Sequence, residues 1–283
     1  MRWRSLALVA VMLSWSFAPA MAWTEATRLR MLADALKVAP PGLAAILKKH
    51  RAEMERGMTA PSAYETEEVH FLRAEGGGLA ADAVVLKTKQ AKDLLARKGQ
   101  LARFAFEAGA LAHLVSDVSF PLNASDADPR EPLVREGYRA MIERSLDKIL
   151  FVLDPAPAPL PDSNALRSYL LESARRAARS YPRIAPAFKD DGTPVNAQAV
   201  DERSVPFGVA ALAYSQAVND VARVWALLWR ESGGDMTGAV PLLAGRPQVY
   251  GPVQPLVYGP VQPLAAGTPP APVPARPPAA EKP

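Results

Sequence analysis

The spacing of apolar residues along the chain follows the 3.6-residue period of α-helices almost throughout. Thr24 is suited to cap the first helix, and Pro40 and Pro41 end it, while Pro41 also suits the first turn of the next one. Strand-like alternation is nearly absent. The pattern predicts an all-α, multi-helix single domain, with helices expected over residues 25–38, 41–56, 79–98, 100–118, 131–153, 163–181 and 206–232.

Residues 57–78 and 189–205 interrupt this pattern and are expected to be irregular, because they are rich in glycine, proline and short polar residues. From residue 235 onward the composition changes to proline-rich. An octapeptide, VYGPVQPL, occurs twice in tandem from Val249 to Leu264. Such a segment buries too little apolar area to fold, so residues 235–283 are predicted to form a disordered tail that contacts a protein or the cell envelope.

The first 22 residues have the order of a secretory signal peptide: Arg2 and Arg4, then an apolar core, then the small residues before Trp23. We expect cleavage after Ala22, export to the periplasm or the medium, and a folded domain over residues 23–234. No apolar run in the remaining chain approaches the roughly 20 residues of a membrane span.

Charge and cysteine content narrow the classes of function. The net charge of +4 falls to about +2 once Arg2 and Arg4 are removed, and no aromatic residues interleave the basic runs, so no stable nucleic-acid partner is indicated. The chain has no cysteine, which excludes disulfides, thiolate ligands and lipid attachment at cysteine.

His113 and Asp117 stand four residues apart in an apolar helical run that ends at Pro121, so both project from one helix face. The surrounding stretch, GALAHLVSDVSFPLN, resembles the signature of the family of zinc-dependent phospholipase C and fungal zinc-dependent single-strand nucleases. The resemblance spans about residues 23–234 and implies an all-α fold with a zinc cluster that cleaves phosphodiesters.

The resemblance assigns metal-binding roles to four residues here. Trp23 matches the family's first residue, whose amino group and carbonyl bind zinc; His70 matches a histidine of an irregular segment; and His113 and Asp117 match a central pair whose aspartate bridges two zinc ions. Other expected ligand positions are replaced, by Arg28, Ser62, Asn123, Arg135 and Arg139.

The number of matched ligands limits how many metal ions the protein could bind. His70, His113 and Asp117 with water form the smallest recurring set of a catalytic zinc, with Glu55, Glu65, Glu67 or Glu68 as a candidate fourth ligand. One ion alone stabilises the charge of a phosphodiester transition state poorly. The first hypothesis is therefore a weak, single-zinc hydrolase of phospholipid or nucleotide phosphodiesters.

The arginine replacements support a second hypothesis, a non-catalytic descendant without metal that acts as an envelope binding or interaction protein. A guanidinium near Asp117 would neutralise the carboxylate that zinc neutralises in the family. The arginines would then hold the core or line a pocket for a phosphate-bearing ligand; alternatively they are only solvated helix faces. Three of the matched residues also have structural alternatives: Trp23 as a hydrophobic staple of the first helix, His70 as an exposed polar residue near a loop, and His113 as a buried hydrogen-bonding partner of Asp117.

Overall fold

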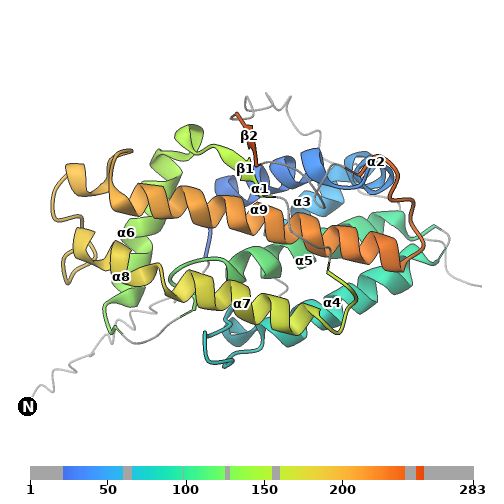
Figure 1. Ribbon diagram of the computed structural model, residues 1–283, viewed down its shortest axis with the longest axis horizontal. Coiled ribbons are helices and arrows are strands. Elements are labelled where there is room, and N and C mark those ends of the chain that lie inside the picture. Colours follow the sequence, from blue (N-terminus) through green and yellow to red (C-terminus); the bar gives the residue numbers. More distant parts are fainter. Residues whose placement is uncertain are drawn as a thin grey trace, which may run out of the picture. The chain divides into compact units, whose positions relative to one another are not determined.

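The computed structural model describes residues 22–59, 66–97, 99–124, 128–154, 160–239 and 247–251. Within these ranges the protein is built from helices, with one small two-stranded sheet (Figure 1). The α-helices are α1 (Glu25–Val38), α2 (Pro41–Lys49), α3 (Arg51–Thr59), α4 (Ala80–Leu95), α5 (Leu101–Val118), α6 (Glu131–Arg144), α7 (Leu166–Ala178), α8 (Tyr181–Ile184) and α9 (Val205–Glu231). The 3-10 helices are η1 (Glu67–His70), η2 (Leu146–Lys148), η3 (Ala185–Ala187) and η4 (Gln198–Val200). The all-α prediction is confirmed.

Helix α5 is the centre of the core. Every residue from Ala108 to Val118 is buried, and the helix packs against α3, α4 and α9. Figure 1 shows α5 lying among these helices. A helix that is apolar on all sides can be stable only when it is surrounded by others. The helix that carries two of the candidate metal ligands, His113 and Asp117, is therefore the most enclosed one.

Two glycines allow α3 and α5 to approach closely. A Cβ atom at Gly109 of α5 would lie 2.0 Å from the carbonyl oxygen of Met54, and one at Gly57 of α3 would lie 2.0 Å from the carbonyl oxygen of Phe106. Neither position has room for a side chain, so the two backbones touch. This contact brings the C-terminal turn of α3 to the middle of α5.

The structure differs from the sequence prediction at two helix boundaries. The helix expected over residues 41–56 is divided at His50, whose backbone leaves the helical conformation (φ −112°, ψ 41°), so that α2 and α3 are separate helices. The helix expected over residues 131–153 ends at Arg144, and Phe151–Leu153 form strand β1. Strand β1 pairs antiparallel with β2 (Gln248–Tyr250), which lies inside the segment predicted to be disordered.

The remaining boundaries of the predicted helices lie within three residues of the prediction. Thr24 caps α1 through its side-chain oxygen, and Gly99 separates α4 from α5 with a left-handed backbone (φ +76°). No helix in the described ranges is long and apolar enough to span a membrane. Most of the proposed signal peptide and of the tail lies outside the described residues.

Removal of the hydroxyl group is expected to change the stability of the protein differently at two buried tyrosines. The hydroxyl of Tyr214 donates to Asp34 Oδ2 at 2.6 Å, whereas that of Tyr138 has no hydrogen-bond partner among the described residues. Tyr214→Phe is expected to lower the free energy of unfolding by about 1.5–3 kcal/mol, and Tyr138→Phe to leave it unchanged or slightly higher. Chemical denaturation of the two variants measures the difference; equal losses would contradict the assignment of the bond.

Candidate metal centre

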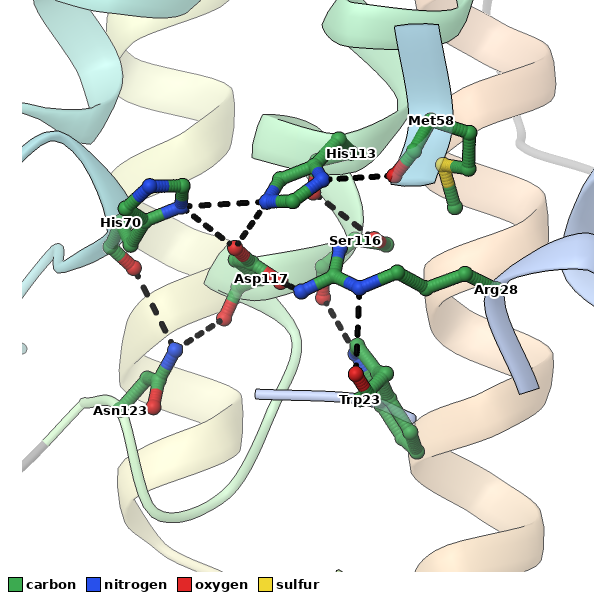
Figure 2. A network of polar contacts seen from close by, with 8 residues as sticks. All are labelled: Trp23, Arg28, Met58, His70, His113, Ser116, Asp117 and Asn123. Carbon is green, nitrogen blue, oxygen red and sulfur yellow. Dashed lines mark hydrogen bonds and ion pairs between the residues drawn. The ribbon is translucent and has the colours of Figure 1, made fainter. Parts of the chain in front are cut away.

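Three elements bring the candidate ligands together (Figure 2). His113 and Asp117 lie one turn apart on α5, and His70 is the last residue of η1. Helix α1 contributes Arg28 and the C-terminal turn of α3 contributes the Met58 carbonyl. The centre thus draws on segments separated by long stretches of sequence, and the burial of α5 encloses it.

The ligand atoms of His70, His113 and Asp117 form a tight triangle. His70 Nδ1 lies 2.8 Å from Asp117 Oδ2, His113 Nε2 lies 3.2 Å from the same oxygen, and the two ring nitrogens are 3.3 Å apart. All three residues are buried, and the group could hold a metal ion. The predicted convergence of these side chains is therefore found.

The orientation of His113 is fixed by α3. Its Nδ1 lies 2.7 Å from the carbonyl oxygen of Met58. Since a carbonyl only accepts hydrogen bonds, Nδ1 carries a proton and donates it. Nε2 is then the ring nitrogen that faces Asp117 and remains for a metal ion. A metal-binding histidine commonly has this arrangement, with its other ring nitrogen bonded to a backbone carbonyl.

Arg28 occupies the other side of the Asp117 carboxylate. Its Nη2 lies 2.7 Å from Asp117 Oδ1, and both side chains have an exposed fraction of 0%. Burial alone would raise the pKa of Asp117, but the charge of Arg28 and the contact with His113 hold that pKa well below its usual range. Asp117 is thus an anion whose two oxygens are divided between a guanidinium and the two imidazoles.

Trp23 is joined to the same guanidinium through its backbone. Arg28 Nε donates to the Trp23 carbonyl at 3.1 Å, and the indole Nε1 donates to the Ser116 carbonyl at 2.9 Å. The ring is buried and lies edge-on against Phe120, with 4.9 Å between ring centroids. Trp23 therefore packs into the core, and its carbonyl oxygen is bonded to Arg28.

The other replaced positions have structural partners. Asn123 Nδ2 donates to the carbonyls of His70, at 3.3 Å, and Asp117, at 3.4 Å, and so ties η1 to the end of α5. Arg135 donates to the Leu122 carbonyl and lies over the Phe71 ring, and Arg139 pairs with Glu136 at 3.4 Å. Of the three arginines, Arg28 is the one with a hydrogen bond to the ligand triangle. Ser62 lies outside the described residues.

Neither described glutamate side chain proposed as a fourth ligand belongs to the triangle. Glu55 pairs with Arg51 at 2.5 Å, and Glu68 is exposed. Glu65 and the side chain of Glu67 lie outside the described part of the chain. A further ligand from the protein is thus not provided by Glu55 or Glu68.

Sequence reasoning missed two features around the centre. The Met58 carbonyl is a backbone group without a residue-type signal, although Gly57 and Gly109 mark the close approach that places it. The second is Asp220 of α9, a buried carboxylate that accepts from Ser119 and Ser173 at 3.0 and 2.9 Å, and from Tyr169. Asp220 joins α9 to α7 and to the residue that follows α5, and so fixes the helix end beyond Asp117.

The described residues could hold one metal ion and do not provide the ligands of a cluster. Zinc with bonds of about 2.0–2.1 Å holds tetrahedral ligand atoms about 3.3 Å apart, which is close to the observed triangle. A second ion bridged by Asp117 would need Oδ1, and that oxygen is bonded to Arg28. The guanidinium contacts both groups that the family resemblance gives to a further zinc ion, the Asp117 carboxylate and the Trp23 carbonyl.

Comparisons with known proteins bear on the fold. No protein-family model matches the chain, and no curated protein matches it in sequence. Among solved structures, the alpha toxin from Clostridium absonum is similar, with a TM-score of 0.51 and 14% identity, over 75% of this chain and 67% of the toxin. The chain has an all-α, phospholipase C-like fold. At this identity the likeness concerns the fold alone.

Proposed function

We propose that this protein is a non-catalytic member of the phospholipase C-like fold, which acts after export as a binding or interaction protein of the cell envelope. The observation that carries the proposal is the buried ion pair between Arg28 and Asp117. The guanidinium is a permanent cation, and it contacts the carboxylate oxygen that would otherwise be available to a second metal ion. The guanidinium thereby balances the charge of Asp117 within the protein. No metal ion is needed to neutralise this carboxylate.

The burial of the centre also supports this proposal. His70, His113 and Asp117 have exposed fractions of 6%, 2% and 0%. A catalytic zinc keeps one position open to substrate, whereas a closed arrangement is typical of structural sites. A phospholipid headgroup or a nucleotide would need the surrounding helices to move before it reached these side chains.

The orientation of His113 favours a second candidate function, a weak metal-dependent phosphodiester hydrolase. His70, His113 and Asp117 would bind one zinc ion, with His113 held by Met58 and the carboxylate held by Arg28. Zinc at such a centre activates water and neutralises charge on a phosphoryl group. The protein's own contribution would be to orient the ligands and to exclude bulk water.

Turnover assays separate the two candidates. The purified exported protein is incubated with zinc and with bis(4-nitrophenyl) phosphate, phosphatidylcholine vesicles or single-stranded DNA. We expect no hydrolysis above that of zinc alone. The matched variant is His113→Asn, because the asparagine amide can still donate towards Met58 while the Nε2 ligand is lost. Zinc-dependent turnover by the wild type that disappears in this variant would establish the hydrolase and overturn the proposal.

Export is a further part of the proposal, supported by the charged, apolar and small-residue order of residues 1–22. We expect the exported protein to begin at Trp23. Intact-mass measurement of protein from the periplasm or the culture medium tests the cleavage position. A protein that retains residues 1–22 and stays in the cytoplasm would contradict it.

A further inference from the structure

Strand β1 has a single edge available for pairing with another strand. Along its other edge, the Val152 amide donates to Ser215 Oγ at 3.1 Å, and the Val152 carbonyl accepts from Asn219 Nδ2 at 2.9 Å. Both partners are side chains of α9, so this edge is already satisfied. In an extended strand the amides and carbonyls of Phe151 and Leu153 then face the opposite edge. That edge accepts one strand at a time.

Strand β2 pairs with this edge of β1 and makes few side-chain contacts there. The pairs are Phe151 with Tyr250, Val152 with Val249 and Leu153 with Gln248. The Tyr250 ring stacks on Phe151 with 5.3 Å between centroids, and Lys37 Nζ lies 5.8 Å from the centroid of the same ring. Val249 is 63% exposed. Recognition therefore depends on the backbone and on one aromatic ring that follows a valine.

The same recognition element occurs a second time in the chain. Val249 and Tyr250 begin the first VYGPVQPL octapeptide, and Val257 and Tyr258 begin an identical copy. The second copy lies outside the described residues. The residue before it is Leu256 instead of Gln248, at a position where the pairing uses backbone groups. The β1 edge contains nothing that distinguishes Val257–Tyr258 from Val249–Tyr250 by side chain.

We propose that the edge of β1 is a docking site for either copy of the VYGPVQPL repeat of the same chain, so that the protein exchanges between two registers. In one register Val249 and Tyr250 pair with β1, as in the structure, and in the other Val257 and Tyr258 take their places. The Pro-rich segment beyond the docked strand is eight residues shorter in the second register. The exchange thus changes how far the tail can reach from the helical body.

The second register has a small disadvantage. Docking the second copy lengthens the connection from the end of α9 by eight residues, which on loop-closure scaling lowers its population about twofold. It also loses the exposed hydrogen bond from the Tyr250 hydroxyl to Gln248. Exposed bonds of this kind contribute little to stability. Both registers are expected to be populated, with the first favoured several-fold at most.

Engineered disulfides measure the two registers, because the chain has no cysteine of its own. Val152 and Val249 form the non-hydrogen-bonded pair of the ladder, in which Cα atoms are about 4.5 Å apart, within disulfide range. The full-length protein is prepared with Val152→Cys combined with Val249→Cys, with Val257→Cys or, as a matched control in the second copy, with Val261→Cys. Each variant is equilibrated in a glutathione redox buffer, and its effective thiol concentration is determined.

The expected effective concentration for the 152–257 pair lies within about tenfold of the 152–249 pair and at least tenfold above the 152–261 control. In the 152–257 protein, Tyr250→Ala is expected to raise the disulfide fraction and Tyr258→Ala to lower it. A 152–257 value no higher than the control, while 152–249 forms, overturns the proposal. Disulfides at 257 that join two molecules instead of one also overturn it.

If Val152→Cys destabilises the sheet, the test can use the tyrosines alone. Stacking on Phe151 protects the ring of the docked tyrosine from reagents such as tetranitromethane, so nitration of Tyr250 and Tyr258 is followed by peptide mass spectrometry. Tyr250→Ala is expected to slow the nitration of Tyr258 at least twofold. An unchanged rate at Tyr258 overturns the proposal.

Discussion

Replacement of Arg28 by methionine is expected to lower the free energy of unfolding by about 3–5 kcal/mol. The reason is the charge that remains. Asp117 is fully buried, and its Oδ1 accepts from Arg28 at 2.7 Å. Without the guanidinium the carboxylate keeps only its contacts with the two histidines, and the Trp23 carbonyl loses its donor. Urea denaturation followed by circular dichroism measures the loss.

Arg167→Met is the matched control for this prediction. Arg167 also pairs with an aspartate, Asp82, but both side chains are more than half exposed. Exposed ion pairs contribute about 0–1 kcal/mol to the free energy of unfolding, so Arg167→Met is expected to lower it by no more than that amount. A loss at Arg28 no larger than the loss at Arg167 would show that the ion pair with Asp117 does not hold the centre.

The second large effect is expected at Gly109. In Gly109→Ala the new Cβ atom would lie 2.0 Å from the Met54 carbonyl oxygen, so α3 and α5 must separate. Overpacking of this kind between two backbones is expected to cost about 3 kcal/mol or more. The separation would also weaken the bond from His113 Nδ1 to Met58 at the end of α3. Thermal unfolding measures the stability, and NMR of the His113 ring reports the bond.

Gly208→Ala provides the comparison within a helix. Gly208 lies on an exposed face of α9, and a Cβ atom there would have no neighbour within 4 Å. Alanine at such a position is expected to raise the free energy of unfolding by up to about 1 kcal/mol. A neutral or stabilising effect of Gly109→Ala would contradict the close approach of the α3 and α5 backbones at this position.

The helices could be predicted from the sequence because apolar periodicity and capping residues are local signals. Thr24 and Gly99 mark boundaries that the structure shares. The break at His50 carries no comparable signal, since the residues on both sides favour helix. Strand β1 was missed because its apolar residues continue the pattern of α6, and its conformation depends on β2 and on α9 side chains far along the chain.

The candidate site was also predicted only in part from the sequence. The four-residue spacing of His113 and Asp117 placed both on one helix face, and the family resemblance pointed to His70, Trp23 and Arg28. The contact of Arg28 with Asp117 was one alternative among several, because the sequence does not show where a long side chain ends. The role of Asn123 was likewise hidden. It occupies an expected ligand position, yet it donates to two backbone carbonyls and holds the loop after α5.

The number of zinc ions bound per chain tests most directly the claim that Arg28 takes the place of a cation at this centre. It is measured by equilibrium dialysis on the folded wild type and on Arg28→His, which exchanges the guanidinium for a ligand. We expect no more than one zinc ion on the wild type and one additional ion on Arg28→His. Two or three ions on the wild type would contradict it.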